Sequence, residues 1–511
     1  GPSDHSMDTW RTGHWQAEVE PGQYEVTVQH QGVIRMRRTV EVQSDNEKLD
    51  LALEPIEPAL PASFSLTSLS IPQQISALYV AYYGRAGDPS GLKHWIESYQ
   101  QGQDEAEGSN LILADFATKF SDSAETRDLF PFLGNETGTS RDDVGDFVDS
   151  VFNNLFDRSP GEGRGYWIDR VVDEIESGGS LGPLLLEIAR GASGGDVETL
   201  TKKVAAAETY SFLATTNAGR FKAEAARKVV RDEAPDAHGV GGARAAAGDE
   251  LGLPDVDQVR ARPDFQSVTF STEDNVEARD INLVIQGIGV GHTVLEQVFD
   301  DGGVHKALDG LEVRTVATGN GSPGSGACCT GGETELFTDT KHPDWEGRDQ
   351  SFIVKTMVHE LTHVWQANNG ATGEPAWFHE GVAEYMGYLA LRGLGEMSDA
   401  ESLQQQTFLA LSTEEAETPL AELKDYSVTW PGHIGYIAVE ALVDRSPFGA
   451  RSLEMLAERL TDGMPWEDAI EQTFDVHFEE FVSSFDEWKG ELVDQNSKLG
   501  KTPGSRDTAR E

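Results

Sequence analysis

The feature that most constrains this chain is a run of seventeen residues, 351–367, that contains neither Pro nor Gly and carries the pattern H-E-x-x-H at 359–363. Its apolar residues recur at helical spacing, so we predict a single helix. Residues four apart lie on one helix face, so His359 and His363 can both donate an imidazole nitrogen to one metal ion. Glu360 sits further round, where it can reach a metal-bound water without being a ligand. The alternative is a surface helix with two solvated histidines.

A catalytic zinc ion needs a third protein ligand and an open position. Gln366 and Asn369 stand where the metzincin pattern requires Gly and His, which excludes that pattern. Downstream, residues 375–385 read P-A-W-F-H-E-G-V-A-E-Y. With H-E-x-x-H on one helix and W-x-x-E-G-x-A-E on a second, the chain resembles the gluzincin branch of zinc metallopeptidases, more loosely over about 350–490. This resemblance implies one catalytic Zn²⁺, held by His359, His363 and Glu380, with Glu360 as general base.

The neighbours of Glu380 are predicted from their place on the second helix. Glu384 follows Glu380 by four residues and shares its face, so we expect it to accept the spare N–H of a ligand histidine; a solvated carboxylate is the alternative. His379 points about 100° away from Glu380 and is predicted to be a neighbour rather than a ligand. The resemblance also implies a Tyr near the metal at the start of the helix beginning at Gly432. Tyr436 is therefore the candidate donor to a developing oxyanion, with a half-buried core position as the alternative.

Upstream of the H-E-x-x-H helix the pattern predicts mixed secondary structure. We predict one helix and three strands, at His292–Phe299, Ile281–Ile285, Leu311–Val316 and Thr334–Phe337. Gluzincin-like catalytic domains place an edge strand beside the zinc, and Glu335–Thr338 is the expected edge, where a substrate chain could pair. The loop before it holds the only cysteines, Cys328 and Cys329. They could form a vicinal disulfide, stay reduced or lie at the rim of the cleft, and we assign them no catalytic role.

Residues 71–215 contain a repeat with an offset of 72 to 73 residues. An aromatic helix followed by Arg85 and Trp95 recurs as a second aromatic helix followed by Arg158 and Trp167. Leu113, Phe116 and Ala117 likewise align with Leu185, Ile188 and Ala189. Such self-similarity predicts one helical unit used twice. It resembles a tandem helical domain of unknown function in secreted and surface bacterial proteins. The aromatic stripes are predicted to be core, and the two arginines to tie loops together.

The chain as a whole is predicted to be multidomain. Residues 1–6 look like an expression scar, and 7–55 resemble part of a small β-sandwich of the carboxypeptidase-regulatory-like kind, with strands at Gln23–His30, Val33–Val42 and Leu49–Leu53. A Pro-containing linker is expected at 56–70, the all-α tandem repeat at 71–215, and a linker with one helix, Ala223–Arg231, at 216–262. An α+β zincin-like catalytic domain with a mostly helical C-terminal subdomain is expected at 263–490, then a disordered tail at 491–511.

Charge and composition limit the partners. The formal net charge is −48 and no apolar run is long enough to span a membrane, so we expect neither nucleic acid nor a membrane span. Calcium would suit an acidic surface, but no calcium-binding motif is present and we predict no site. No signal peptide is visible; a secreted or cell-surface protein with a trimmed N terminus is expected.

The predicted function is hydrolysis of peptide bonds in a protein or peptide substrate. Two alternatives stay open at this stage. One is a surface interaction protein whose zincin-like domain binds without cleaving, and the other is a zinc hydrolase that is not a peptidase. The helical repeat is a candidate for binding a surface or a protein partner.

Overall fold

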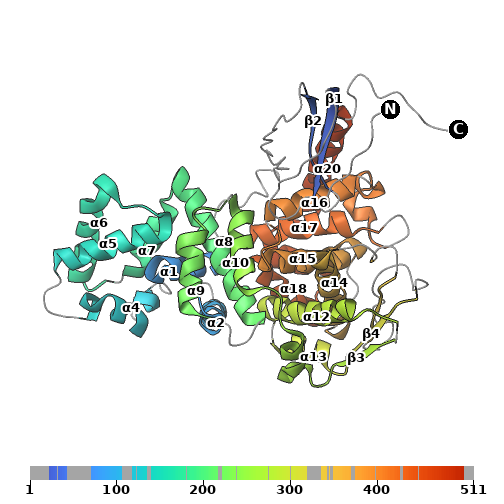
Figure 1. The fold of residues 1–511 in the computed structure, drawn as a ribbon, viewed down its shortest axis with the longest axis horizontal. Coiled ribbons are helices and arrows are strands. Elements are labelled where there is room, and N and C mark those ends of the chain that lie inside the picture. Colours follow the sequence, from blue (N-terminus) through green and yellow to red (C-terminus); the bar gives the residue numbers. More distant parts are fainter. Residues whose placement is uncertain are drawn as a thin grey trace. The chain divides into compact units, whose positions relative to one another are not determined.

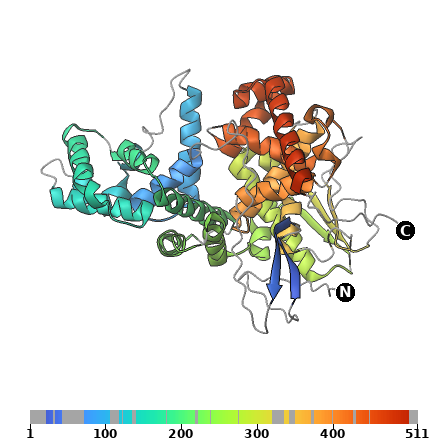
Figure 2. The same ribbon diagram turned by 90° about the horizontal axis from the view of Figure 1, so that it is seen from above.

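The structure is a computed structural model (Figures 1 and 2). It describes residues 22–30, 33–42, 71–105, 118–121, 123–134, 140–179, 181–216, 221–237, 239–273, 275–299, 301–318, 335–341, 345, 349–369, 375–397, 399–411, 413–425, 430–446 and 448–499. The chain divides into two compact units, 1–58 and 59–511. The described residues are mostly helical, with one antiparallel strand pair and one three-stranded parallel sheet. We predicted a multidomain chain with a β-sandwich fragment, an all-α repeat and an α+β domain; the described residues agree with a multidomain, mostly helical chain, and the zincin-like assignment stays a prediction.

The first unit contains an antiparallel pair of strands, β1 (Gly22–His30) and β2 (Val33–Val42). The register shifts between Val28 and Gln29, as at a bulge. These two strands confirm the predictions at 23–30 and 33–42. The remaining predictions for this stretch, the expression scar at 1–6, the strand Leu49–Leu53 and the linker at 56–70, lie outside the described residues.

The repeat region is helical, as predicted. Its elements are α1 (Ile71–Tyr83), α2 (Pro89–Glu105), α4 (Ala124–Leu129), η1 (Pro131–Gly134), α5 (Arg141–Phe156), η2 (Gly161–Gly163), α6 (Arg164–Glu176), α7 (Leu181–Arg190) and α8 (Gly195–Thr216). The residue that follows α1 is Gly84 and the one that follows α5 is Asp157, and both adopt the left-handed conformation with φ of 57°. The second copy therefore keeps the same helix ending with a different residue, because Asp tolerates this conformation better than most side chains. Residues 113, 116 and 117 lie outside the described residues.

The two repeated arginines make equivalent contacts. Each guanidinium lies over two aromatic rings of the preceding helix and pairs with a carboxylate in the first turn of a later helix. The contacts are Tyr79, Tyr83 and Glu125 for Arg85, and Phe152, Phe156 and Asp196 for Arg158. The arginines were predicted to tie loops together; each instead joins the segment after one helix to the first turn of another. The aromatic residues of α1 are buried, as predicted.

The segment 216–262, predicted as a linker with one helix, is more ordered than that. It contains α9 (Ala223–Lys228), the π-helical turn η3 (Val229–Glu233), α10 (Gly239–Leu251) and α11 (Val256–Ala261). The first two match the predicted helix, but the predicted linker at 239–248 is wrong, because α10 packs along α8. Its Ala243 and Ala247 are completely buried, so the Gly- and Ala-rich composition serves close helix packing rather than flexibility.

The parallel sheet lies in the third region, with the strand order β3-β4-β5. Its strands are β3 (Thr269–Thr272), β4 (Glu312–Val316) and β5 (Glu335–Asp339), after η4 (Pro263–Phe265). The last two confirm predicted strands, and β5 is at one edge among the described strands. The strand predicted at Ile281–Ile285 is wrong, since these residues belong to α12 (Ala278–Val298). Leu283, Val284 and Ile285 are all buried there, and a helix buried on most sides gives a continuous apolar run that imitates a strand.

Small residues let α12 approach the H-E-x-x-H helix, α14 (Gln350–Asn368). A Cβ on Gly287 would lie 2.6 Å from Cβ of Met357, and one on Gly291 would lie 2.9 Å from Cδ2 of Leu361. The face of α14 that carries Met357 and Leu361 is therefore pressed against α12. His359 and His363 each follow one of these residues by two positions, and two positions along a helix correspond to a turn of about 200°. The two histidines therefore point away from α12.

A second close approach joins α15 (Ala376–Gly393) to α17 (Gly432–Arg445). A Cβ on Gly381 would lie 2.9 Å from Cα of Gly435, and closer still to the carbonyl group of that residue. Gly381 follows Glu380 directly, so this crossing sets the height of Glu380 above α14. The opposite end of α15 contacts α8 and α10, two helices of the region 71–262. The Arg392 carbonyl accepts hydrogen bonds from Thr209 Oγ1 (3.4 Å) on α8 and from Arg244 Nη1 (3.2 Å) on α10.

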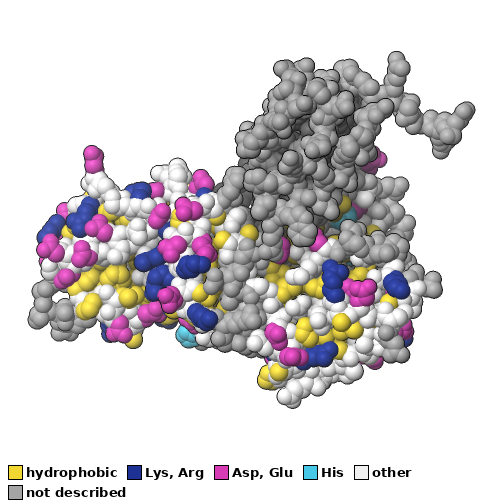
Figure 3. All heavy atoms as spheres, in the orientation of Figure 1, with side chains coloured by type: hydrophobic (Ala, Val, Ile, Leu, Met, Phe, Trp, Pro, Cys, Tyr) yellow, Lys and Arg dark blue, Asp and Glu magenta, His cyan; other side chains and the backbone are white. Residues whose placement is uncertain are grey.

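The third region, from residue 263 onward, contains eight further elements among its described residues. They are α13 (Asp301–Leu308), α16 (Asp399–Leu411), η5 (Glu414–Ala416), η6 (Leu420–Glu422), η7 (Gly449–Arg451), α18 (Ser452–Thr461), α19 (Trp466–Phe474) and α20 (Phe478–Leu499). The tail predicted from residue 491 is wrong as far as Leu499, where α20 ends, and 500–511 lie outside the described residues. Among the described helices, none combines the length and the apolar character needed to cross a membrane. On the face in Figure 3, acidic side chains are interspersed with Lys and Arg.

Candidate metal centre

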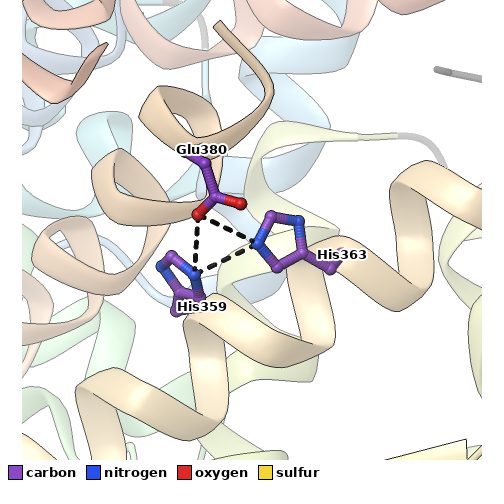
Figure 4. A group of neighbouring side chains, drawn as sticks. All are labelled: His359, His363 and Glu380. Carbon is purple, nitrogen blue, oxygen red and sulfur yellow. Dashed lines mark hydrogen bonds and ion pairs between the residues drawn. The ribbon is translucent and has the colours of Figure 1, made fainter. Parts of the chain in front are cut away.

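Two helices bring the predicted ligands together. α14 begins at Asp349, whose carboxylate accepts the Phe352 N–H, and it carries His359 and His363 one turn apart. α15 begins after Pro375 and places Glu380 in its second turn. In Figure 4 the carboxylate of Glu380 faces the two imidazoles across the space between the helices.

The three side chains form a compact triangle of ligand atoms. Nε2 of His359 and Nε2 of His363 are 3.1 Å apart, and each lies 3.5 Å from Oε2 of Glu380. All three residues are buried. A tetrahedral ion with bonds of about 2.1 Å holds its ligand atoms about 3.4 Å apart. The two imidazoles and the carboxylate could therefore hold a tetrahedrally coordinated metal ion.

The electrostatics of the triangle favour a cation. Burial favours the neutral acid, but the imidazoles of His359 and His363 hold the pKa of Glu380 well below its usual range. Burial alone would lower the pKa of His363, yet Glu380 and Glu360 outweigh it and raise that pKa to about 9. A proton therefore occupies His363 near neutral pH when no metal is bound, and binding of a divalent ion must displace it.

Gln366 fixes which nitrogen of His363 faces the triangle. Nε2 of Gln366 donates to the carbonyl oxygen of His379 at 3.0 Å, so its Oε1 is the atom that lies 2.7 Å from Nδ1 of His363. An amide oxygen can only accept, so Nδ1 of His363 carries hydrogen and donates. In the neutral ring this leaves Nε2 with the lone pair that a metal ion requires.

Glu384 lies behind the other histidine. Its Oε1 is 3.6 Å from Nδ1 of His359, a close contact that is longer than a hydrogen bond, and it accepts from Nζ of Lys355 at 2.7 Å. Burial opposes ionisation of Glu384, but Lys355 and His359 lower its pKa, so the carboxylate stays charged. The structure thus brings Glu384 to the expected nitrogen and adds Lys355 as the cation that balances it.

The structure places the other predicted residues as follows. Glu360 is buried on α14, close enough to His363 to raise its pKa. His379 stacks on the ring of His363, with centroids 4.6 Å apart, and donates no atom to the triangle. Burial and the charge of His363 lower the pKa of His379 to about 4, which keeps it neutral. Cys328 and Cys329 lie outside the described residues.

The structure does not bring Tyr436 to the triangle. Its ring is completely buried, and its hydroxyl accepts from Nη2 of Arg392 at 2.9 Å, within an ion pair between Arg392 and Glu440. Arg392 is twelve residues beyond Glu380 on α15, about 18 Å along the helix axis. Tyr436 therefore takes the core alternative, and we withdraw it as an oxyanion donor.

Sequence reasoning missed three residues around the triangle. Gln366 lies about one turn after His363, to which it bonds, and Lys355 lies one turn before His359 and pairs with Glu384, so helical spacing on α14 could have found both. Trp430 donates from Nε1 to Oε2 of Glu380 at 3.1 Å and is 38% exposed, but it comes from the segment before α17 and no local pattern marks it.

Comparison with protein-family models, curated proteins and solved structures finds no match to this chain.

Proposed function

We propose that this chain is a zinc-dependent peptidase. One observation carries the proposal: two imidazole nitrogens and a carboxylate oxygen, from residues that are 21 positions apart at most in the sequence (359 to 380), converge within 3.5 Å. Two residues behind the triangle support this proposal: Gln366 accepts a hydrogen bond from the ring of His363, and a carboxylate oxygen of Glu384 lies 3.6 Å from Nδ1 of His359.

The protein's own residues have distinct tasks in this proposal. A zinc ion held by His359, His363 and Glu380 supplies Lewis acidity, polarising a substrate carbonyl and acidifying a water. The carboxylate of Glu360 takes a proton from the attacking water and passes it to the nitrogen of the leaving amine. The indole N–H of Trp430, which already donates to Glu380, stands at the exposed side of the centre.

We propose a protein or peptide substrate that approaches along β5. An edge strand has unpaired backbone groups that an extended chain can join. In the described sheet β5 pairs with β4 on one side, and it contacts α14, the helix of the histidines. As part of the same proposal, the protein acts outside the cell or at its surface.

The test is the Glu360→Gln variant. We expect it to keep a full zinc content and its fold, and to lose activity on an unstructured protein substrate by roughly 10²–10⁴-fold, because an amide cannot accept the proton. Glu422→Gln, an exposed carboxylate on η6, is the matched control and should cleave at the parent rate. A chelator should abolish the parent's activity and added zinc should restore it.

The outcomes separate the alternatives. Zinc-bound parent protein that cleaves no peptide in a broad library contradicts the peptidase proposal and favours a binding role. Hydrolysis of small esters or amides without hydrolysis of peptides favours a different zinc hydrolase. Equal peptide cleavage by Glu360→Gln and the parent refutes Glu360 as the base.

A further inference from the structure

A second group of histidine and carboxylate side chains lies on the far side of α12. Asp264 of η4, His292 and Glu296 of α12 and His305 of α13 line a cavity of about 290 Å³ together with Gly302. None of these residues belongs to the proposed catalytic centre. We propose that they form a second, structural site for a divalent transition-metal ion such as zinc.

The geometry supports a shared ion. One ring nitrogen of His292 and one oxygen each of Asp264 and Glu296 lie within 4.8 Å of one another. Individual separations are 3.3 Å from Nδ1 of His292 to Glu296 and 3.9 Å from its Nε2 to Asp264. His305 Nδ1 is 3.8 Å from the other oxygen of Asp264. One imidazole binds a given ion through a single nitrogen, so one carboxylate must turn toward the nitrogen that the other carboxylate faces. The three ligand atoms, now within 4.8 Å of one another, would then close to the roughly 3.4 Å between ligands of a tetrahedral ion by side-chain rotation.

The position of His292 separates this group from an ordinary surface ion pair. Its side chain is 3% exposed and packs edge-on against Phe265, with centroids 5.2 Å apart, so its ring is fixed in place. Its two ring nitrogens face carboxylates from two different elements. Asp264 and Glu296 are only partly exposed, at 40% and 29% of their side chains, while His305 is at the open mouth.

The charges around the cavity leave room for a divalent ion. Burial lowers the pKa of Arg262, and the nearby carboxylates of Glu296 and Asp264 oppose that shift, so one guanidinium lies close to both acidic side chains. Its Nη1 lies 3.5 Å from Oγ1 of Thr293. Two carboxylates beside this one guanidinium leave negative charge that a divalent cation would neutralise.

The donor set selects the kind of ion. Two carboxylates with one or two imidazoles suit zinc and its neighbours, whereas calcium and magnesium prefer oxygen ligands alone. An ion at this position would join η4, α12 and α13. Its role is therefore to fix the elements that support the back of α12, which in turn supports α14.

The test is a zinc titration of the full chain followed by dialysis and metal analysis. We expect two equivalents in the parent, and one in the double variant Asp264→Asn, Glu296→Gln, which keeps the shape of both side chains. A Glu380→Ala variant should also retain one equivalent, held by the second group. The control is His477→Asn, which breaks a similar pair, His477 Nδ1 to Glu471 at 3.7 Å, that has no third candidate ligand among the described residues.

The results decide between the two sites. A double variant that binds as much zinc as the parent overturns the second site, as does a Glu380→Ala variant that comes out of dialysis empty. Cobalt substitution gives a second measurement that does not depend on the folding of the double variant: a Glu380→Ala protein should show the visible absorption of a four-coordinate cobalt ion, and its absence contradicts the proposal. Failure here leaves the peptidase test with Glu360→Gln unaffected.

Discussion

Replacing Gly381 by alanine is expected to weaken zinc binding without altering any ligand side chain. The added Cβ would be 2.9 Å from Cα of Gly435 and nearer to its carbonyl group, whereas carbon atoms in contact normally stay at least about 3.4 Å apart. The crossing of α15 and α17 must therefore open by at least about 0.5 Å. Overpacking of this kind costs roughly 1–3 kcal/mol. Glu380, the next residue, moves with α15, and metal sites tolerate only about 0.2 Å. We expect zinc affinity to fall about 10- to 100-fold.

The assay is competition for zinc with a chromophoric chelator, with denaturant unfolding measured on the same samples. Gly490→Ala is the matched control, since it makes the same substitution within α20, where the added Cβ meets nothing within 4 Å. That variant should bind zinc as the parent does and unfold at equal or slightly higher denaturant concentration. If Gly381→Ala keeps the parent's affinity, the α15–α17 crossing does not set the position of Glu380 and the reasoning fails.

Four further outcomes are expected. Glu380→Ala should lose zinc from the catalytic centre on dialysis while His379→Ala keeps it, and metal analysis showing the reverse would remove Glu380 as a ligand. Glu384→Ala should lower zinc affinity about 10- to 100-fold by releasing the ring of His359, measured by the same competition assay. Burial lowers the pKa of Lys203 from 10.5 to about 8, so the unfolded chain binds more protons between these values and the free energy of unfolding should rise with pH there; Lys203→Met should show a smaller rise. With a net charge of −48, the melting temperature should fall as salt is removed, and a flat or rising trend would contradict self-repulsion as a destabilising effect.

Local spacing predicted much of the candidate centre. A separation of four residues, about one helix turn, was enough to place His359 beside His363 and Glu384 on the same face as Glu380, because each relation is internal to one helix. The resemblance to gluzincins supplied Glu380, whose meeting with the histidines depends on how two helices pack. Packing is also where sequence reasoning failed: Tyr436 turns toward Arg392 rather than the triangle of candidate ligands, because a buried ion pair joins Arg392 of α15 to Glu440 of α17.

The misread segments have a common physical cause. Helix propensity argues against Gly in a helix, so the Gly- and Ala-rich α10 was predicted as a linker, and the apolar run at the start of α12 imitated a strand because that helix is buried on most sides. In both helices the small residues allow a neighbouring helix to come close, and that packing outweighs their low propensity. A pattern read along one segment carries no information about the neighbour that stabilises it.

The contacts of α8 and α10 with the last turn of α15 determine which fragments of the protein can retain the candidate centre. The sequence suggests cutting near residue 262 to obtain a free-standing enzyme, yet α8 and α10, which precede that point, provide the hydrogen bonds to the Arg392 carbonyl and the Phe212 ring against which Gly393 rests. A fragment that begins after 262 would expose this end of the helix to water while keeping Glu380 at the other. α8 and α10 therefore support the helix that carries Glu380, and the smallest fragment that retains the candidate centre begins before α8.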